Sequence, residues 1–188
     1  MAKKKKIVVA VTGASGSIYA EKLLQKLSKL SAEIEEIALI VSETGKQVWE
    51  YELETELPKF DIIKQYENDS FFASPASGSA GYDSMVIIPC TVGTLGRIAN
   101  GTSNDLIARS ADVMLKERKP LILVLRESTY NLIHIENMRT VTLAGGIIFP
   151  ASPSFYSKPK NINELVDTVV NRILEMLGFE VDGFKWGK

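Results

Sequence analysis

Residues 12–17, Thr-Gly-Ala-Ser-Gly-Ser, are of types that could bind an anion and also act on it. An apolar run at residues 7–11 precedes them, and leucines at helical spacing follow, which predicts a strand, a turn and a helix. Free backbone N–H groups and the positive end of a helix dipole favour a phosphate at such a turn. Ser15 adds a hydroxyl, so the segment predicts a site that holds a phosphorylated ligand and takes part in its chemistry.

Two enzyme classes with a similar turn fit this sequence poorly. A nicotinamide-dependent dehydrogenase of the short-chain type could open on TGASG, but Tyr19 stands where the third glycine of the fingerprint belongs. The Tyr-x-x-x-Lys pair of that class, Tyr156 and Lys160, encloses Pro159, which would break a helix. A serine hydrolase needs Gly-x-Ser-x-Gly, and GASG at residues 13–16 is one residue short. Both classes are therefore disfavoured.

The chain has one cysteine, Cys90, and one histidine, His134. An internal disulfide and a Cys/His metal cluster within one chain are excluded, and we expect no metal site. Cys90 follows an apolar strand and is interpreted as a buried structural thiol, with a reactive thiol of lowered pKa as the alternative. His134 lies in an expected helix and is interpreted as a structural residue.

Apolar segments alternate with helical patterns along the chain, as in an α/β protein. Strands are expected at residues 7–11, 34–41, 84–88, 120–125 and 147–149, and helices at 17–30, 44–53, 92–99, about 105–118, 131–144 and 162–177. The turn-rich residues 66–83 are expected to form a long loop, functional or mobile. This alternation predicts right-handed βαβ units in one doubly wound parallel sheet, and a single domain over residues 1–188.

In such sheets ligands bind beyond the carboxyl ends of the strands. The segments that follow the expected strands carry a glycine turn, hydroxyls and one pair of opposite charges: residues 13–15, Ser42, residues 91–94, and Arg126 with Glu127. These side chains should converge at one edge of the sheet, which is the strongest inference from the pattern alone.

Composition limits the classes of partner. The net charge is −1, which argues against nucleic acid or an anionic membrane as the main partner. No apolar run approaches the ~18 residues of a membrane span, and no signal-peptide core follows the lysines at residues 3–6. A cytoplasmic, metal-free protein is the expectation.

Several blocks of sequence together resemble one known family: GASGSIYAEKLL, PASGSAGYDSMVIIPC, TLGRIANGTSNDLIARSADVMLKERKPLILVLRE, LIHIENM and FYSKP. They resemble the UbiX/Pad1 family of flavin prenyltransferases over about residues 7–186, most specifically over residues 104–127. The resemblance implies a Rossmann/flavodoxin-like three-layer αβα sandwich that binds FMN, in a homododecamer with sites between subunits. It implies that dimethylallyl phosphate alkylates reduced FMN at N5 and then at C6, without a metal. The product, prenylated FMN, would serve UbiD-type decarboxylases.

The resemblance also assigns roles to residues. Those that match FMN contacts are Gly13, Ala14, Ser15, Ser42, Thr91, Val92, Gly93, Thr94 and Arg126. Those that match the site of the dimethylallyl phosphate are Arg109, Lys116, Tyr156, Arg172 and Trp186. Those that match catalytic residues are Ser15, Glu52 and Glu127.

The predicted chemistry needs these residue types. Three cations and a tyrosine hydroxyl can hold a phosphate dianion as it leaves, and an aromatic face stabilises an allylic cation. Loss of a proton from C6 needs a base, and Glu127 could protonate the phosphate first and accept that proton later.

Plainer interpretations stay open for several of these residues. Arg109 and Lys116 could be an exposed pair on one helix face, and Arg126 with Glu127 could form a salt bridge at a strand end. Glu50 or Glu54 could be the acid in place of Glu52, and Tyr156, Arg172 and Trp186 could be a packing residue, a surface charge and a core-capping aromatic.

The sequence departs from the family pattern at two places. Thr91 stands where many relatives have serine, so the hydroxyl is retained. Ser128 and Thr129 replace the Thr-Pro or Ala-Pro that often follows Arg-Glu, which loosens the loop after the acid.

Two alternative functions are compatible with the expected fold. A flavin-dependent cysteine-type decarboxylase would carry a PASANT-like motif and an early histidine, where this chain has PASGS and a late histidine. A non-enzymatic FMN carrier would bind flavin and leave dimethylallyl phosphate untouched.

Overall fold

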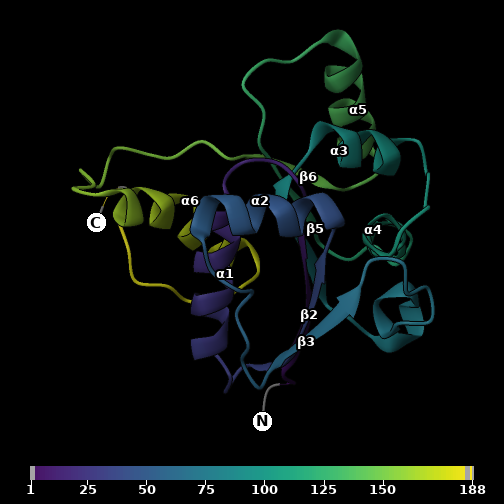
Figure 1. The fold of residues 1–188 in the computed structure, drawn as a ribbon, viewed down its shortest axis with the longest axis horizontal. Coiled ribbons are helices and arrows are strands. Elements are labelled where there is room, and N and C mark those ends of the chain that lie inside the picture. Colours follow the sequence, from purple (N-terminus) through teal and green to yellow (C-terminus); the bar gives the residue numbers. More distant parts are fainter. Residues whose placement is uncertain (1–2, 185–186, 188) are drawn as a thin grey trace.

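The computed structural model describes residues 3–184 and residue 187. Its centre is one sheet of six parallel strands in the spatial order β3-β2-β1-β4-β5-β6 (Figure 1). The strands are β1 Lys5–Val11, β2 Ile34–Val41, β3 Ile63–Glu67, β4 Ser84–Cys90, β5 Leu121–Leu125 and β6 Ile147–Pro150. The order reverses between β1 and β4, as in a Rossmann fold, so the carboxyl ends of these two strands flank the place where such sheets bind ligands. The predicted fold class is confirmed.

Helices cover both faces of the sheet and make three layers. They are α1 Ser17–Lys29, α2 Glu43–Leu53, α3 Val92–Ala99, α4 Leu106–Lys116, α5 Leu132–Leu143 and α6 Ile162–Met176. In β1, Ile7 and Val9 belong to the core that α1, α2 and α6 cover, while Val8 and Ala10 belong to the core under α3, α4 and α5. Because successive side chains of a strand point to opposite faces, the apolar run of β1 is buried on both sides.

The prediction missed one strand and extended a loop into it. Residues 66–67, expected as loop, belong to β3, which pairs in parallel with β2 at the edge of the sheet. Within β3 only Ile63 and Tyr66 are partly buried and the other three residues are exposed, because β3 is an edge strand with solvent on one side.

The rest of the expected loop is short helical turns held by hydrogen bonds. It contains the 3₁₀ turns η1 Ser74–Ala76 and η2 Gly78–Ala80. The Ser74 hydroxyl lies 2.8 Å from the Tyr66 hydroxyl and 2.9 Å from that of Tyr82. Tyr82 is buried and donates a short hydrogen bond to the Glu36 carboxylate on β2. This cluster ties the segment to the edge of the sheet.

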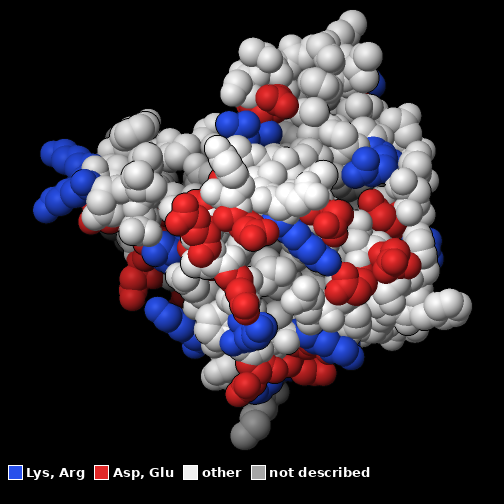
Figure 2. All heavy atoms as spheres, viewed as in Figure 1, with Lys and Arg blue, Asp and Glu red and all other residues white. Residues whose placement is uncertain are grey.

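The surface combines mixed charge with one apolar projection. Acidic and basic side chains intermingle across the lower part of the face in Figure 2, whereas mostly uncharged atoms cover the region of α5 at the top. Four large apolar side chains of α5 are exposed there: Leu132, Ile133, Ile135 and Leu143. Within residues 3–184 and 187, no helix has the length and apolar character needed to cross a membrane.

Candidate active site

The turns after β1 and β4 meet through Thr12, a residue that the sequence analysis did not assign. Its hydroxyl donates to the Pro89 carbonyl at 2.7 Å and accepts from the Thr91 N–H at 3.0 Å. Thr12 is buried, so its bond to Pro89 is shielded from solvent, while the bond from Thr91 is partly buried. The predicted flavin-contact segments 13–15 and 91–94 are therefore held side by side at the point where the strand order reverses.

A carboxylate of the chain itself lies at the start of α1. Glu52 accepts hydrogen bonds from the N–H groups of Gly16, at 2.9 and 3.1 Å, and of Ser17, at 2.8 Å. Burial alone would raise the pKa of Glu52, but hydrogen bonds from Ser15, Ser17 and Gly16 lower it below its ordinary value. The sequence predicted a phosphate on this turn, and Glu52 occupies these two N–H groups instead.

This geometry bears on which acid of α2 belongs to the site. Glu52 comes from the last turn of α2 and reaches a segment 36 residues earlier in the chain. The backbone N–H groups at the start of α1 carry the positive end of its dipole, so a carboxylate there is stabilised. Neither Glu50 nor Glu54 makes these contacts among the described residues. The geometry therefore favours Glu52, and it joins Glu52 to Ser15.

Two other predicted hydroxyls begin helices at the same edge. The Ser42 hydroxyl accepts from the Gly45 N–H at 3.0 Å at the start of α2, and the Thr91 hydroxyl accepts from the Thr94 N–H at 3.0 Å at the start of α3. Serine and threonine are favoured at this position because they satisfy N–H groups that lack partners in the helix. Both side chains are only half-buried, so their helix starts face the site.

Close packing brings α2 against the first turn. A Cβ atom at Gly13 would lie 2.6 Å from the Thr44 hydroxyl oxygen, so only glycine fits there. At Gly93, on the α3 side, a Cβ would meet nothing nearer than 3.8 Å, and the residue is exposed. The turn at Gly13 is therefore closely packed against α2, whereas the turn at Gly93 has free space beside it and can admit a ligand.

Arg126 and Glu127 follow β5 and differ in their surroundings. The Arg126 N–H donates to the Cys90 carbonyl at 3.1 Å, which places Arg126 beside the end of β4. Burial raises the pKa of Tyr19, on α1, and the positive charge of Arg126 acts in the opposite direction, so the guanidinium lies near the first turn of α1. Glu127 is exposed and accepts from the Ser128 N–H at 2.9 Å. Among the described residues no ion pair joins Arg126 to Glu127.

The donor set of hydroxyls, backbone N–H groups and one arginine fits FMN. Hydroxyls and N–H groups suit a phosphate and a ribityl chain, and Arg126 suits an anion or a carbonyl of the flavin. The structure thus brings together Gly13, Ala14, Ser15, Ser42, Thr91, Val92, Gly93, Thr94 and Arg126 at one edge, with Glu52 at the start of α1.

Arg109 and Lys116 do not join this group within one chain. Arg109 donates to the Ala76 carbonyl at 3.1 Å and pairs with Asp112 at 2.8 Å, so it faces the segment around η1. Helix α4 begins at the carboxyl edge and ends at Lys116, shortly before Pro120, whose carbonyl accepts from the Met85 N–H at the start of β4. Lys116, exposed at the end of α4, therefore lies near the amino edge of the sheet.

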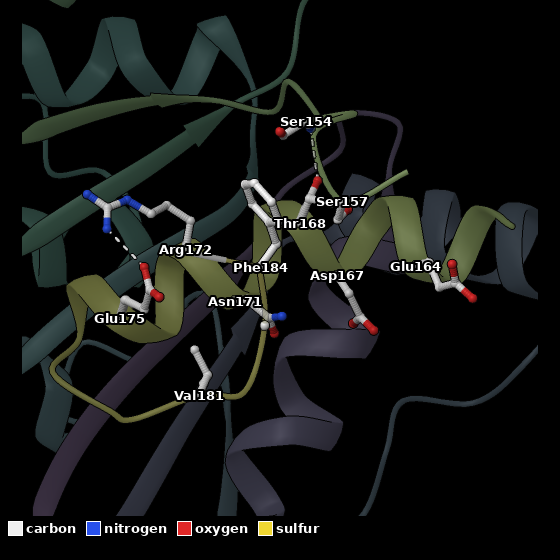
Figure 3. Close-up of a pocket in the computed structure, with 11 residues that line it drawn as sticks. Ser154, Ser157, Glu164, Asp167, Thr168, Asn171, Arg172, Glu175, Val181 and Phe184 are labelled. Atoms are coloured by element: carbon white, nitrogen blue, oxygen red, sulfur yellow. Dashed lines mark hydrogen bonds and ion pairs between the residues drawn. The ribbon is translucent and has the colours of Figure 1, made fainter. Parts of the chain in front are cut away.

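Tyr156 and Arg172 lie together at a second place, around α6. Tyr156 stacks on Phe184 with ring centroids 6.3 Å apart, and Arg172 pairs with Glu175 at 2.9 Å. Figure 3 shows Arg172 and Phe184 at a cavity of about 380 Å³ between α6, the segment around Ser154 and the C-terminal segment. Trp186, the remaining predicted residue of this set, lies outside the described residues.

The one cysteine and the one histidine of the chain, Cys90 and His134, both lie where a structural role is expected. Cys90 is buried, and burial raises its pKa to about 12, while the positive charge of Arg97 lowers it less. The His134 N–H donates to Asn131 at 2.9 Å and its Nδ1 accepts from the Asn131 N–H at 3.4 Å, which fixes the start of α5. Both match their structural interpretation. In the described part of the chain, no group of three or more His, Cys, Asp or Glu residues could hold a metal ion.

Known proteins resemble the chain over nearly its whole length. The family model described as Flavoprotein matches residues 1–174. A flavin prenyltransferase UbiX of Methanocaldococcus jannaschii is 44% identical, covering 97% of this chain and 98% of that protein.

Two solved structures agree with this relationship. AnUbiX (PadA1), solved in complex with FMN and dimethylallyl pyrophosphate, is 35% identical with a TM-score of 0.87, covering 97% of this chain and 100% of that one. A dodecameric FMN-dependent UbiX-like decarboxylase from Escherichia coli O157:H7 is 33% identical with a TM-score of 0.89, with the same coverage. The predicted family is confirmed: the chain belongs to the UbiX flavin prenyltransferases, flavoproteins that use FMN.

Proposed function

We propose that the chain transfers a dimethylallyl group from dimethylallyl phosphate to N5 and C6 of reduced FMN, without a metal ion. The observation that carries the proposal is the contact of Glu52 with the start of α1 beside Ser15, at the edge where the flavin-contact segments meet. A hydroxyl and a carboxylate so coupled can move a proton at a reacting nitrogen. Membership of the flavin prenyltransferase family supports the same reaction.

Reduced FMN is the acceptor, and the protein must hold it and manage protons. The turns at residues 13–15 and 91–94, with Ser42 and Arg126, would bind it through N–H groups, hydroxyls and a cation. In the transfer, the C–O bond of the donor would break as a bond from that carbon to N5 forms, phosphate would leave, and N5 would lose its proton. Ring closure would then add a proton to the double bond of the prenyl group and join its tertiary carbon to C6, which loses its proton.

Glu127 is the acid and base of our proposal. It is exposed at the end of β5, where among the described residues its carboxylate is held only by the neighbouring Ser128 N–H. A carboxyl group there can give a proton to the leaving phosphate and accept the proton from C6. Glu52 and Ser15 would serve the earlier step at N5.

The phosphate of the donor would be bound between subunits. Arg109 faces the segment around η1, Lys116 lies at the end of α4, and Tyr156 and Arg172 lie around α6; the last three are exposed. A homo-oligomer, as in the dodecameric relative, would bring these residues of neighbouring copies to each flavin. Three cations and a tyrosine hydroxyl then hold the dianion. We propose that Trp186 contributes an aromatic face and that the product passes to a UbiD-type decarboxylase in the cytoplasm.

Mass spectrometry of the flavin tests the proposal. Anaerobic protein is incubated with chemically reduced FMN and dimethylallyl phosphate, and the flavin is then recovered. A flavin heavier by one C5 prenyl unit is the expected result. Unchanged FMN with both the monophosphate and the pyrophosphate donor would contradict the proposal and favour an FMN carrier or a cysteine-type decarboxylase, which a peptide with a C-terminal cysteine would distinguish.

A further inference from the structure

Arg97 lies beside the FMN-contact turn, and nothing in the sequence motifs assigned it a role. It belongs to α3, and its side chain turns back towards the start of that helix, as long helical side chains do. Its Nη2 group donates to the Thr94 hydroxyl oxygen at 3.0 Å. A Cβ atom at Gly93 would lie 3.9 Å from its Nη1 atom, so the guanidinium borders the open face of the turn.

The two threonine hydroxyls of the turn depend on one another. The Thr91 hydroxyl accepts from the Thr94 N–H and donates to the Thr94 hydroxyl oxygen, both at 3.0 Å. A hydroxyl has one proton and two acceptor positions. Arg97 and Thr91 fill both acceptor positions of Thr94, whose side chain is buried. The guanidinium thus fixes the rotation of the Thr94 hydroxyl and, through it, that of Thr91.

A carboxylate faces Arg97 from the other side. The Asp105 Oδ2 atom lies 3.8 Å from Arg97 Nε, and Oδ1 accepts from the Ala108 N–H at 2.7 Å at the start of α4. A cation beside the start of a helix is electrostatically unfavourable, because the dipole is positive there. The hydrogen bond to Thr94 and the attraction of the Asp105 carboxylate favour this position of the guanidinium, which lies between the starts of α3 and α4.

We propose that Arg97 is a positioning residue for FMN, which orients the hydroxyls of Thr94 and Thr91 in the turn that contacts the flavin. The inference rests on the proposed function, in which residues 91–94 bind FMN. Loss of the guanidinium frees both hydroxyls to rotate and leaves a buried oxygen of Thr94 with one bond fewer. The effect should therefore appear in FMN affinity and be transmitted by Thr94.

The experiment measures FMN binding to full-length apoproteins by quenching of flavin fluorescence, with thermal unfolding of each apoprotein alongside. Arg97→Met removes the donors and keeps an apolar stem of similar length, and Arg97→Lys keeps a cationic donor. Arg139→Met, on the exposed face of α5, is the matched control. Thr94→Val, alone and combined with Arg97→Met, tests whether the effect passes through Thr94.

Arg97→Met should raise the Kd for FMN about tenfold, Arg97→Lys less than about threefold and Arg139→Met not at all. The double variant should bind like Thr94→Val within about twofold. Wild-type affinity in Arg97→Met, failure of lysine to restore binding, or multiplicative effects of the two substitutions would overturn the inference alone. A wild-type chain that does not bind FMN would overturn the proposed function, and this inference with it.

Discussion

Both carboxylate oxygens of Glu52 accept the N–H of Gly16, at 2.9 and 3.1 Å, so the last turn of one helix closes the start of another. Glu52→Gln keeps an acceptor there but removes the negative charge from the positive end of α1. We expect the free energy of unfolding at pH 7 to fall by about 1 kcal/mol. Urea unfolding measures it, with Glu50→Gln on the same helix as control. An unchanged midpoint for Glu52→Gln would show that the contact stabilises nothing.

The lowered pKa of Glu52 gives this contact a pH dependence. Because the pKa in the folded state lies below the ordinary value of 4.5, the stabilisation is complete above that pH and is lost as pH falls through the folded pKa. Ser15→Ala removes one hydrogen bond to the carboxylate, so it should shift the pKa of Glu52 upwards and slow prenyl transfer while FMN stays bound. Carboxyl NMR titration and single-turnover rates check both effects. If Ser15→Ala turns over like the parent, Ser15 has no part in the chemistry.

Glu127→Gln should bind FMN like the parent and fail at ring closure, because its amide can neither give nor accept the required proton. The side chain is exposed and makes only a local hydrogen bond, so folding should be unaffected. Proton NMR of the recovered flavin reports the step directly, since the C6 proton disappears on closure. Full turnover by this variant would remove Glu127 from the mechanism.

Arg109→Ala should raise the KM for dimethylallyl phosphate and leave FMN affinity unchanged, because Arg109 faces Ala76 rather than the flavin segments of its own chain. If the site lies between subunits, mixing Arg109→Ala with Ser15→Ala should restore part of the activity. Some sites would then combine an intact Ser15 with an intact Arg109 from a neighbour. Each variant refolded alone is the control, and a mixture no more active than its components would place the site within one chain.

Cys90 should resist alkylation in the folded protein. Burial raises its pKa to about 12, so almost no thiolate forms at pH 8. Iodoacetamide with intact-mass detection should modify the chain only after denaturant is added. Stoichiometric labelling of the folded protein at pH 8 would show a reactive thiol and contradict the structural interpretation.

The layers could be predicted from the sequence because the central strands are apolar on both faces. Strand β3 could not, since its pattern alternates weakly and its place depends on backbone hydrogen bonds with β2. Edge strands carry little sequence signal because one side meets solvent.

The site could be predicted only where a local sequence pattern marks its residues. Ser42 and Thr91 precede helices, a local pattern that the sequence displays. Thr12 and the contact of Glu52 with α1 depend on residues 79 and 36 positions apart, which no local pattern encodes. The roles of Arg109 and Lys116 rest on the resemblance, because in one chain they lie apart from the flavin segments.

The hydrogen bond between Thr12 and Thr91 spans 79 residues of sequence. During synthesis, the first turn leaves the ribosome before its partners Pro89 and Thr91 have been added to the chain. Strand β1 is synthesised early, but if residues 13–15 and 91–94 both bind flavin, as we propose, the site is complete only after residue 94 has been added and β4 has paired with β1. On this proposal FMN binds late in the folding of each new chain, and a fragment that ends before β4 should not bind flavin.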